Sequence, residues 1–190
     1  PRVVDNLKRH LIAAHPELAA YAAIREVKRE GGLNIEALEM SADQRRLLMG
    51  FRSPLLDGRA IIASIENPGA LFDADERPRI GVPLTTLDLG GNGIRGLSWV
   101  PDLAGYLVIA GPVARERLEF QLWFWRGGGA DRPRRVSVAG LPGFEHAEGV
   151  SPAVIDGRKC IILVSDDGSR DEGRCARFLI LRPDQLRIAD

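Results

Sequence analysis

Four polar residues open three similar apolar segments of this 190-residue sequence and are the first candidates for chemistry. They are Asn34 and Glu36 in the first segment, Arg95 in the second and Glu148 in the third. Two carboxylates and an amide supply hard oxygen ligands of the kind that Ca²⁺ accepts. Arg95 beside them would instead neutralise the acids or bind an anionic group through parallel hydrogen bonds. If the segments occupy equivalent places, these side chains meet in a metal site, an anion site or a structural ion-pair cluster.

Two further residues extend this candidate site. Arg52, in Phe51-Arg52-Ser53-Pro54, would add a hydrogen-bond donor at its mouth; alternatively, Pro54 simply ends a strand there. His146 would serve as a general base or metal ligand, or else as a surface or capping residue. The predicted ligand-binding residues are therefore Asn34, Glu36, Arg52, Arg95, His146 and Glu148, with Asn34, Glu36 and Glu148 as the candidate Ca²⁺ ligands.

Other polar motifs are interpreted as loops. Asp166-Asp167-Gly168 lacks the spacing of an EF-hand and predicts a solvated hairpin tip. Arg126-Gly127-Gly128-Gly129 lacks the helix and lysine of a phosphate-binding loop and indicates a flexible hairpin loop. No Gly-x-Ser-x-Gly motif occurs, which disfavours an activated serine. Cys160 and Cys175 are expected to be reduced and buried, as in an intracellular compartment.

The elements that must position these residues change character after residue 30. Before it, apolar residues recur at helical spacing, and with Pro16 at a favourable first position they predict two helices, over 6–14 and 16–30. From Leu33 onward, short β-type runs alternate with Gly, Pro and Asp. Asp57-Gly58, Asp156-Gly157 and Asp167-Gly168 are hairpin-turn signals. Many short strands without intervening helices indicate an all-β, antiparallel fold.

The β-type region also repeats itself. Each unit has an opening strand, two strongly apolar strands and a weaker fourth, and the openings lie 59 and 53 residues apart, from Glu36 to Arg95 to Glu148. Four strands in a unit of about 50 residues is typical of a β-propeller blade. We therefore predict three four-stranded blades, over about 31–89, 90–140 and 141–190, with residues 1–30 as a helical insertion. The three tryptophans are expected to pack between blades.

Three blades make only a partial toroid, because propellers typically close with about 4–8 blades. Arg2-Val3-Val4 is a possible last strand of a preceding blade. An open stack would expose blade faces at both ends, so we expect either missing blades on a longer chain or a second copy of this chain. Since the sequence begins at Pro1, we also expect a processed or truncated N-terminus.

Four short segments carry a resemblance to a known family: Gly32-Leu33-Asn34-Ile35-Glu36-Ala37-Leu38, Gly50-Phe51-Arg52-Ser53-Pro54, Gly93-Ile94-Arg95-Gly96-Leu97 and Glu148-Gly149-Val150. Over about residues 30–188, the chain resembles an uncharacterised bacterial β-propeller family, domain of unknown function 3616. The resemblance implies the C-terminal part of a longer member and brings no established activity or catalytic residues. The chain is more distantly similar to phytase-like esterase and lactonase propellers.

Composition limits the partners. Twenty-six basic residues balance 26 acidic ones, which argues against nucleic acid or anionic lipid as a chain-wide partner. No apolar run approaches the ~20 residues of a membrane helix, and we expect a cytoplasmic location.

The leading hypothesis is a module that binds a small polar or anionic molecule at the common axis, or a protein partner as a scaffold. The alternatives are a Ca²⁺-assisted hydrolase of a lactone or phosphate ester and a structural module that self-associates through blade edges.

Overall fold

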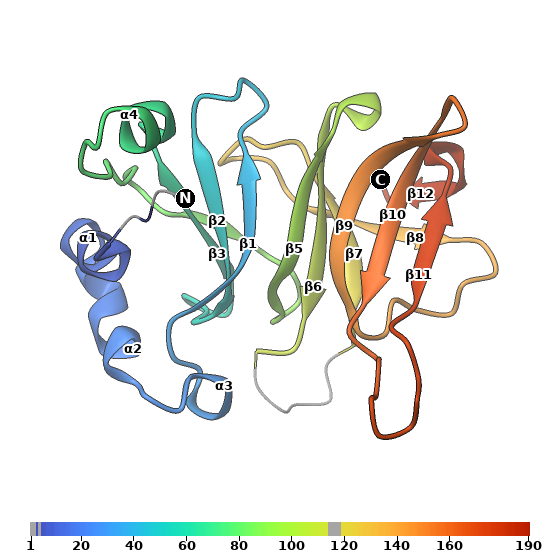
Figure 1. Ribbon diagram of the computed structural model, residues 1–190, viewed down its shortest axis with the longest axis horizontal. Coiled ribbons are helices and arrows are strands. Elements are labelled where there is room, and N and C mark those ends of the chain that lie inside the picture. Colours follow the sequence, from blue (N-terminus) through green and yellow to red (C-terminus); the bar gives the residue numbers. More distant parts are fainter. Residues whose placement is uncertain (1–2, 4, 114–118) are drawn as a thin grey trace.

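The computed structural model describes residues 3, 5–113 and 119–190, which form three antiparallel sheets stacked face to face (Figure 1). The first sheet has the strand order β1-β2-β3-β4, the second β12-β8-β7-β6-β5 and the third β11-β10-β9. The strands are β1 (Asn34–Met40), β2 (Leu47–Ser53), β3 (Ala60–Ile65), β4 (Thr85–Leu87), β5 (Gly93–Val100), β6 (Gly105–Gly111), β7 (Gln121–Trp125), β8 (Arg134–Val138), β9 (Ala147–Ile155), β10 (Arg158–Ser165), β11 (Phe178–Leu181) and β12 (Leu186–Ile188). The fold is therefore mostly β and antiparallel, as predicted. The strand considered over Arg2-Val3-Val4 lies outside the described residues, apart from Val3.

Helices precede the first sheet and interrupt it once. They are α1 (Leu7–Ala14), α2 (Ala19–Ala23), α3 (Val27–Glu30) and α4 (Pro68–Asp73), with 3₁₀ turns at Pro16–Leu18, Pro101–Leu103 and Pro183–Gln185. The helix predicted over 6–14 is confirmed. The one predicted over 16–30 is broken, because Ile24 adopts an extended backbone (ψ 128°) between α2 and α3. The short helix α4 was not predicted.

Two apolar cores hold the three sheets together. Between the first and second sheets, Leu48 and Ile62 pack against Tyr106 and Trp125, with Trp99 and Trp123 at the edge. Between the second and third sheets, residues of β6 and β7 pack against Ile161 and Leu163 of β10. The tryptophans therefore pack between sheets, as predicted.

A third core covers the outer face of the first sheet. Leu11 and Leu18 from the N-terminal helices pack there with Phe51 and Ile61, and α4 adds Leu71. The expectation that an open stack exposes both end faces is therefore wrong at this end, because the helices cover it.

The opposite end of the stack is open. On the outer face of the third sheet, Phe178 is 65% exposed, Ile180 50% and Val164 46%. Val164 pairs with Phe178, and Ile162 pairs with Ile180, so these four side chains share one face of β10 and β11. We call these four residues the outer face of the third sheet.

The last strand departs from the predicted pattern of four strands in each unit. Among the described residues, only the first sheet has four strands, because β12 leaves the third sheet and pairs with β8 of the second. The 3₁₀ turn at Pro183–Gln185 redirects the chain, and Leu186 and Ile188 then pack in the core between the second and third sheets. Partial burial of these two apolar side chains favours this position of the strand.

The turn predictions had mixed outcomes. Asp57-Gly58 and Asp156-Gly157 have the paired positive φ angles of tight hairpin turns and confirm the prediction. The hairpin turn and solvated tip predicted at Asp167-Gly168 are wrong, because neither residue has the positive φ of such a turn and a long loop joins β10 to β11. The Asp167 carboxylate is buried and accepts hydrogen bonds from the Ser165 hydroxyl (2.5 Å) and from Nε of Arg177 (2.5 Å). These hydrogen bonds lower the pKa of Asp167 to about 2.

The cysteine and glycine-rich segments also differ in detail from expectation. Both cysteines are free, but only Cys160 is buried, whereas Cys175 is exposed on the long loop before β11. The glycine-rich loop is fixed by its own hydrogen bonds. Trp125 Nε1 donates to the Gly128 carbonyl at 3.0 Å, and the Gly128 amide donates to Asp131 at 2.9 Å.

Candidate functional site

The first strands of the three sheets share one irregularity. β1, β5 and β9 each carry a β-bulge, at Glu36, Arg95 and Glu148 respectively, where the register with the second strand slips by one residue. A bulge re-aims the side chain that it carries. Since β5 lies between β1 and β9 (Figure 1), these three side chains turn toward one another.

Arg95 joins the three sheets. Its Nη1 donates to Glu36 Oε2 of the first sheet at 3.1 Å and to Glu148 Oε1 of the third at 2.9 Å. Its Nη2 donates to the Pro112 carbonyl at 2.8 Å. Only 7% of the Arg95 side chain is exposed, whereas the side chains of Glu36 and Glu148 are 22% and 37% exposed.

Arg52 and Asn34 complete the arrangement around Glu36. Arg52 Nη1 donates to Glu36 Oε1 at 3.2 Å, and its Nε donates to the Pro112 carbonyl at 3.2 Å. Asn34 Nδ2 donates to the same Glu36 oxygen at 2.8 Å. We call Asn34, Glu36, Arg52, Arg95 and Glu148 the Arg95 cluster. The structure thus brings together five of the six residues predicted from the sequence.

The sixth predicted residue, His146, lies beside the cluster but not in it. It is exposed, and its ring packs at a tilt against the ring of Phe120, with 5.7 Å between the centroids. Phe120 in turn lies under the guanidinium of Arg95, 5.4 Å from ring centroid to Cζ. Among the described residues, the His146 side chain has no hydrogen bond or ion pair with either carboxylate, so a direct general-base pairing with Glu148 is not formed.

Burial and neighbouring charges shift the pKa values of the cluster in opposite directions. Burial lowers the pKa of Arg95, and the Glu36 carboxylate partly restores it. Burial raises the pKa of Glu148, although the charge of Arg95 opposes this. Two arginines and two glutamates leave the cluster formally neutral. One donor is left over, because Nε of Arg95 is buried without an acceptor among the described residues.

Comparison with protein families gives a match over residues 3–177 to a model described as "Protein of unknown function (DUF3616)". The chain belongs to this family. No curated protein and no solved structure matches the chain, so the more distant likeness to phytase-like esterases and lactonases remains a prediction. Within the described part of this DUF3616 chain, no helix is long and apolar enough to cross a membrane.

The Arg95 cluster does not fit Ca²⁺. Both carboxylate oxygens of Glu36 and one oxygen of Glu148 already accept hydrogen bonds from guanidinium groups. A cation would have to displace these arginines and would be repelled by their charge. Over residues 3, 5–113 and 119–190, no group of three His, Cys, Asp or Glu side chains is arranged to hold a metal ion.

Sequence reasoning missed three contributors to the cluster of this DUF3616 chain. The Pro112 carbonyl accepts from both arginines, and a backbone acceptor leaves no signal in residue type. Phe120, which precedes β7 and lies against the Arg95 guanidinium, was not singled out in the sequence. Gly93 allows the close approach of β2, since a Cβ there would lie 1.8 Å from the Arg52 carbonyl oxygen. Of these three contributors, only Gly93 left a signal in the sequence, as the glycine before Ile94-Arg95.

Proposed function

We propose that this chain is a binding module in which the three sheets act as consecutive blades of a propeller-like array. Three features support this interpretation. The sheets stack face to face, their opening strands carry matching bulges, and β1, β5 and β9 lie side by side (Figure 1). The five-stranded second sheet and three-stranded third sheet are variations in which one edge strand has changed sheets. A cytoplasmic location stays a prediction.

The ligand proposed for the Arg95 cluster is a small hydroxycarboxylate. The observation that carries this proposal is the buried Nε of Arg95, which has no acceptor among the described residues. A buried donor without an acceptor costs about 1–3 kcal/mol, and an incoming oxygen atom would remove that cost. A carboxylate oxygen supplies such an acceptor with a charge complementary to Arg95 and Arg52.

Glu148 gives the ligand its second contact. Its side chain is 37% exposed, and its Oε2 has no donor among the described residues, whereas Oε1 is held by Arg95. A ligand hydroxyl would donate to this free oxygen. The chemistry of the cluster therefore matches a carboxylate next to a hydroxyl better than a simple anion or a neutral polyol.

Isothermal titration with citrate, sulfate and glucose tests this assignment. We expect citrate to bind, with sulfate and glucose at least about tenfold weaker, because sulfate has no hydroxyl and glucose has no anionic group. Glu148→Gln and Arg52→Gln should each weaken citrate binding, whereas Glu145→Gln, an exposed neighbour, should not. Equal binding by Glu148→Gln and Glu145→Gln, or no citrate binding at all, would show that the cluster only joins the sheets.

A second candidate function is self-association, and the outer face of the third sheet favours it. Exposed apolar side chains of this extent on a sheet mark an interaction surface. Because helices cover the opposite end of the stack, each chain offers one such end face. One self-complementary face per chain suits a closed two-fold dimer rather than an open filament, so a second copy of the chain is the proposed partner.

Sedimentation equilibrium tests this second function. We expect a dimer that Phe178→Ser and Ile180→Ser convert to monomer. Leu38→Ser is the matched control, because Leu38 is 62% exposed on β1, away from this face. A wild-type chain that stays monomeric at high concentration rules out the dimer.

A further inference from the structure

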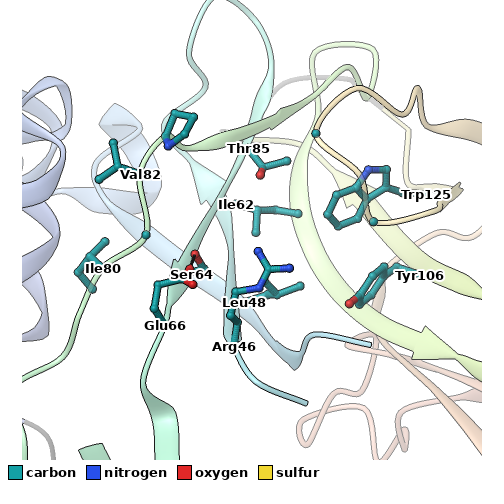
Figure 2. A pocket seen from close by; sticks show the side chains of 14 residues that line it. Arg46, Leu48, Ile62, Ser64, Glu66, Ile80, Val82, Thr85, Tyr106 and Trp125 are labelled. Atoms are coloured by element: carbon teal, nitrogen blue, oxygen red, sulfur yellow. Dashed lines mark hydrogen bonds between the residues drawn. The ribbon is translucent and has the colours of Figure 1, made fainter. Parts of the chain in front are cut away.

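A cavity of about 560 Å³ lies between the first and second sheets and shares no lining residue with the Arg95 cluster (Figure 2). Its volume is within the range of small-molecule sites. Leu48, Ile62, Tyr106 and Trp125 form its apolar floor and belong to the core between the two sheets. The loop from Ile80 to Thr85 forms the opposite wall.

The aromatic side of this cavity is held rigidly. The rings of Tyr106 and Trp125 lie 5.1 Å apart, and Trp99 packs edge-on against Tyr106 at the same distance. The Tyr106 hydroxyl accepts a hydrogen bond from the Ala42 amide at 2.8 Å. Trp125 donates to the Gly128 carbonyl. Fixed aromatic faces such as these bind aromatic or aliphatic groups with little loss of entropy.

Arg46 places an unpaired cation over this floor. Figure 2 shows its guanidinium above Leu48, between the Ser64–Glu66 pair and Tyr106. No carboxylate of the described residues lies within ion-pairing distance of it, whereas both arginines of the Arg95 cluster are paired. The backbone of Arg46 is fixed by Ser41, whose hydroxyl accepts from the Arg46 amide at 2.9 Å. The Arg46 side chain is exposed, and its guanidinium has no hydrogen bond with the described residues, so it is available to an anionic group on a ligand.

Glu66 places an anion on the other wall. Its Oε1 accepts a hydrogen bond from the Ser64 hydroxyl at 2.5 Å, and no described residue donates to its second oxygen. The pair leans on Gly81, where a Cβ would lie 2.3 Å from Ser64 Oγ and 2.4 Å from Glu66 Oε1. A Cβ at this position would therefore displace the Ser64 and Glu66 side chains from their present places. The wall is anchored further by His15, whose Nε2 lies 3.0 Å from the Gly81 carbonyl oxygen.

From these contacts we infer that the cavity binds an α-amino acid with an aromatic or large aliphatic side chain. The α-carboxylate binds Arg46, the α-ammonium binds Glu66, and the side chain packs on Trp125 and Tyr106. A ligand with only one of the two charges leaves either Arg46 or Glu66 without a partner. This site is independent of the ligand proposed for the Arg95 cluster.

Titration of tryptophan fluorescence tests the inference, since Trp125 lines the cavity. The probes are L-phenylalanine, 3-phenylpropanoate, which lacks the ammonium, and phenethylamine, which lacks the carboxylate. We expect phenylalanine to bind and each analogue to bind about tenfold more weakly, the loss typical of one charge-assisted hydrogen bond. Equal binding of the three probes, or no binding of phenylalanine, overturns the inference.

Matched variants assign the effect to the cavity. Arg46→Gln should reduce phenylalanine affinity about tenfold with little change for phenethylamine, and Glu66→Gln should do so with little change for 3-phenylpropanoate. Arg45→Gln is the control, because Arg45 is exposed and does not line the cavity. Glu148→Gln separates the two sites, since it should leave phenylalanine binding intact. Equal losses in Arg45→Gln and Arg46→Gln contradict the assignment.

Discussion

Arg95 and Glu148 are 53 positions apart in the sequence, yet Arg95 Nη1 lies 2.9 Å from Glu148 Oε1 across the second and third sheets. The same nitrogen lies 3.1 Å from Glu36 of the first sheet. One guanidinium therefore connects three sheets whose contacts are otherwise largely apolar. Because hydrogen bonds between a guanidinium and a carboxylate are directional, the cluster also fixes the position of each sheet relative to the next along the strand direction.

Arg95→Met should destabilise the chain by about 2–4 kcal/mol. It leaves Glu148 without its partner and leaves Glu36 with Arg52 and Asn34 only. Breaking a buried ion pair from one side costs about 3–5 kcal/mol, less here because Glu148 is partly exposed. Urea denaturation measures the free energy of unfolding. Lys159→Met is the control, because it removes the exposed ion pair with Asp102 and should cost under about 1 kcal/mol. Equal losses in the two variants would mean that the cluster adds no stability.

Gly93→Ala should prevent folding or destabilise the chain by more than about 3 kcal/mol. The new Cβ would lie 1.8 Å from the Arg52 carbonyl oxygen, and backbone on both sides cannot yield without separating β2 from β5. Circular dichroism and thermal denaturation report the outcome. Gly69→Ala, in α4, meets nothing within 4 Å and should leave stability unchanged or raise it by about 0.5 kcal/mol. A native-like melting temperature for Gly93→Ala would show that the two strands separate easily.

The repeat explains how much of the cluster could be predicted from the sequence. Asn34, Glu36, Arg95 and Glu148 were found because they open three similar units, and side chains at equivalent positions of stacked sheets lie close together. The bulges that aim them were not predictable, since a bulge depends on the register with the neighbouring strand. The contact with the Pro112 carbonyl could not be predicted either, because every residue has a backbone carbonyl.

The sequence predicted those parts of the fold that depend on neighbouring residues. It did not predict those that depend on contacts between residues far apart in the chain. The turns at Asp57-Gly58 and Asp156-Gly157 follow from residue type alone. The transfer of β12 to the second sheet depends on which edge strand offers a better apolar contact, which no local pattern records. The burial of Asp167 depends on Arg177, ten residues later on an irregular loop.

Asp167→Asn should lower stability at neutral pH, and the difference from wild type should disappear in acid. The folded-state pKa of Asp167 is about 2, below its ordinary value of 3.8. The ionised group therefore stabilises the fold above pH 4, and this contribution is lost as the pH falls toward 2. Urea midpoints measured from pH 2 to 7 test this. Asp171→Asn is the control, because Asp171 is exposed on the same loop and forms no ion pair with the described residues. A difference that does not change with pH would contradict the role of the Asp167 charge.

His15→Ala should detach the N-terminal helices from the first sheet. The His15 side chain is buried, and its Nε2 lies 3.0 Å from the Gly81 carbonyl oxygen, so the substitution leaves a cavity and a carbonyl without its partner. We expect a loss of about 1–3 kcal/mol in urea denaturation, together with increased binding of the dye ANS as Phe51 and Ile61 become accessible. His10→Ala, on the less buried side of α1, should change neither measurement. If His15→Ala lowers stability without raising dye binding, the helices stay in place through Leu11 and Leu18 alone, and the contact to Gly81 is not what holds them.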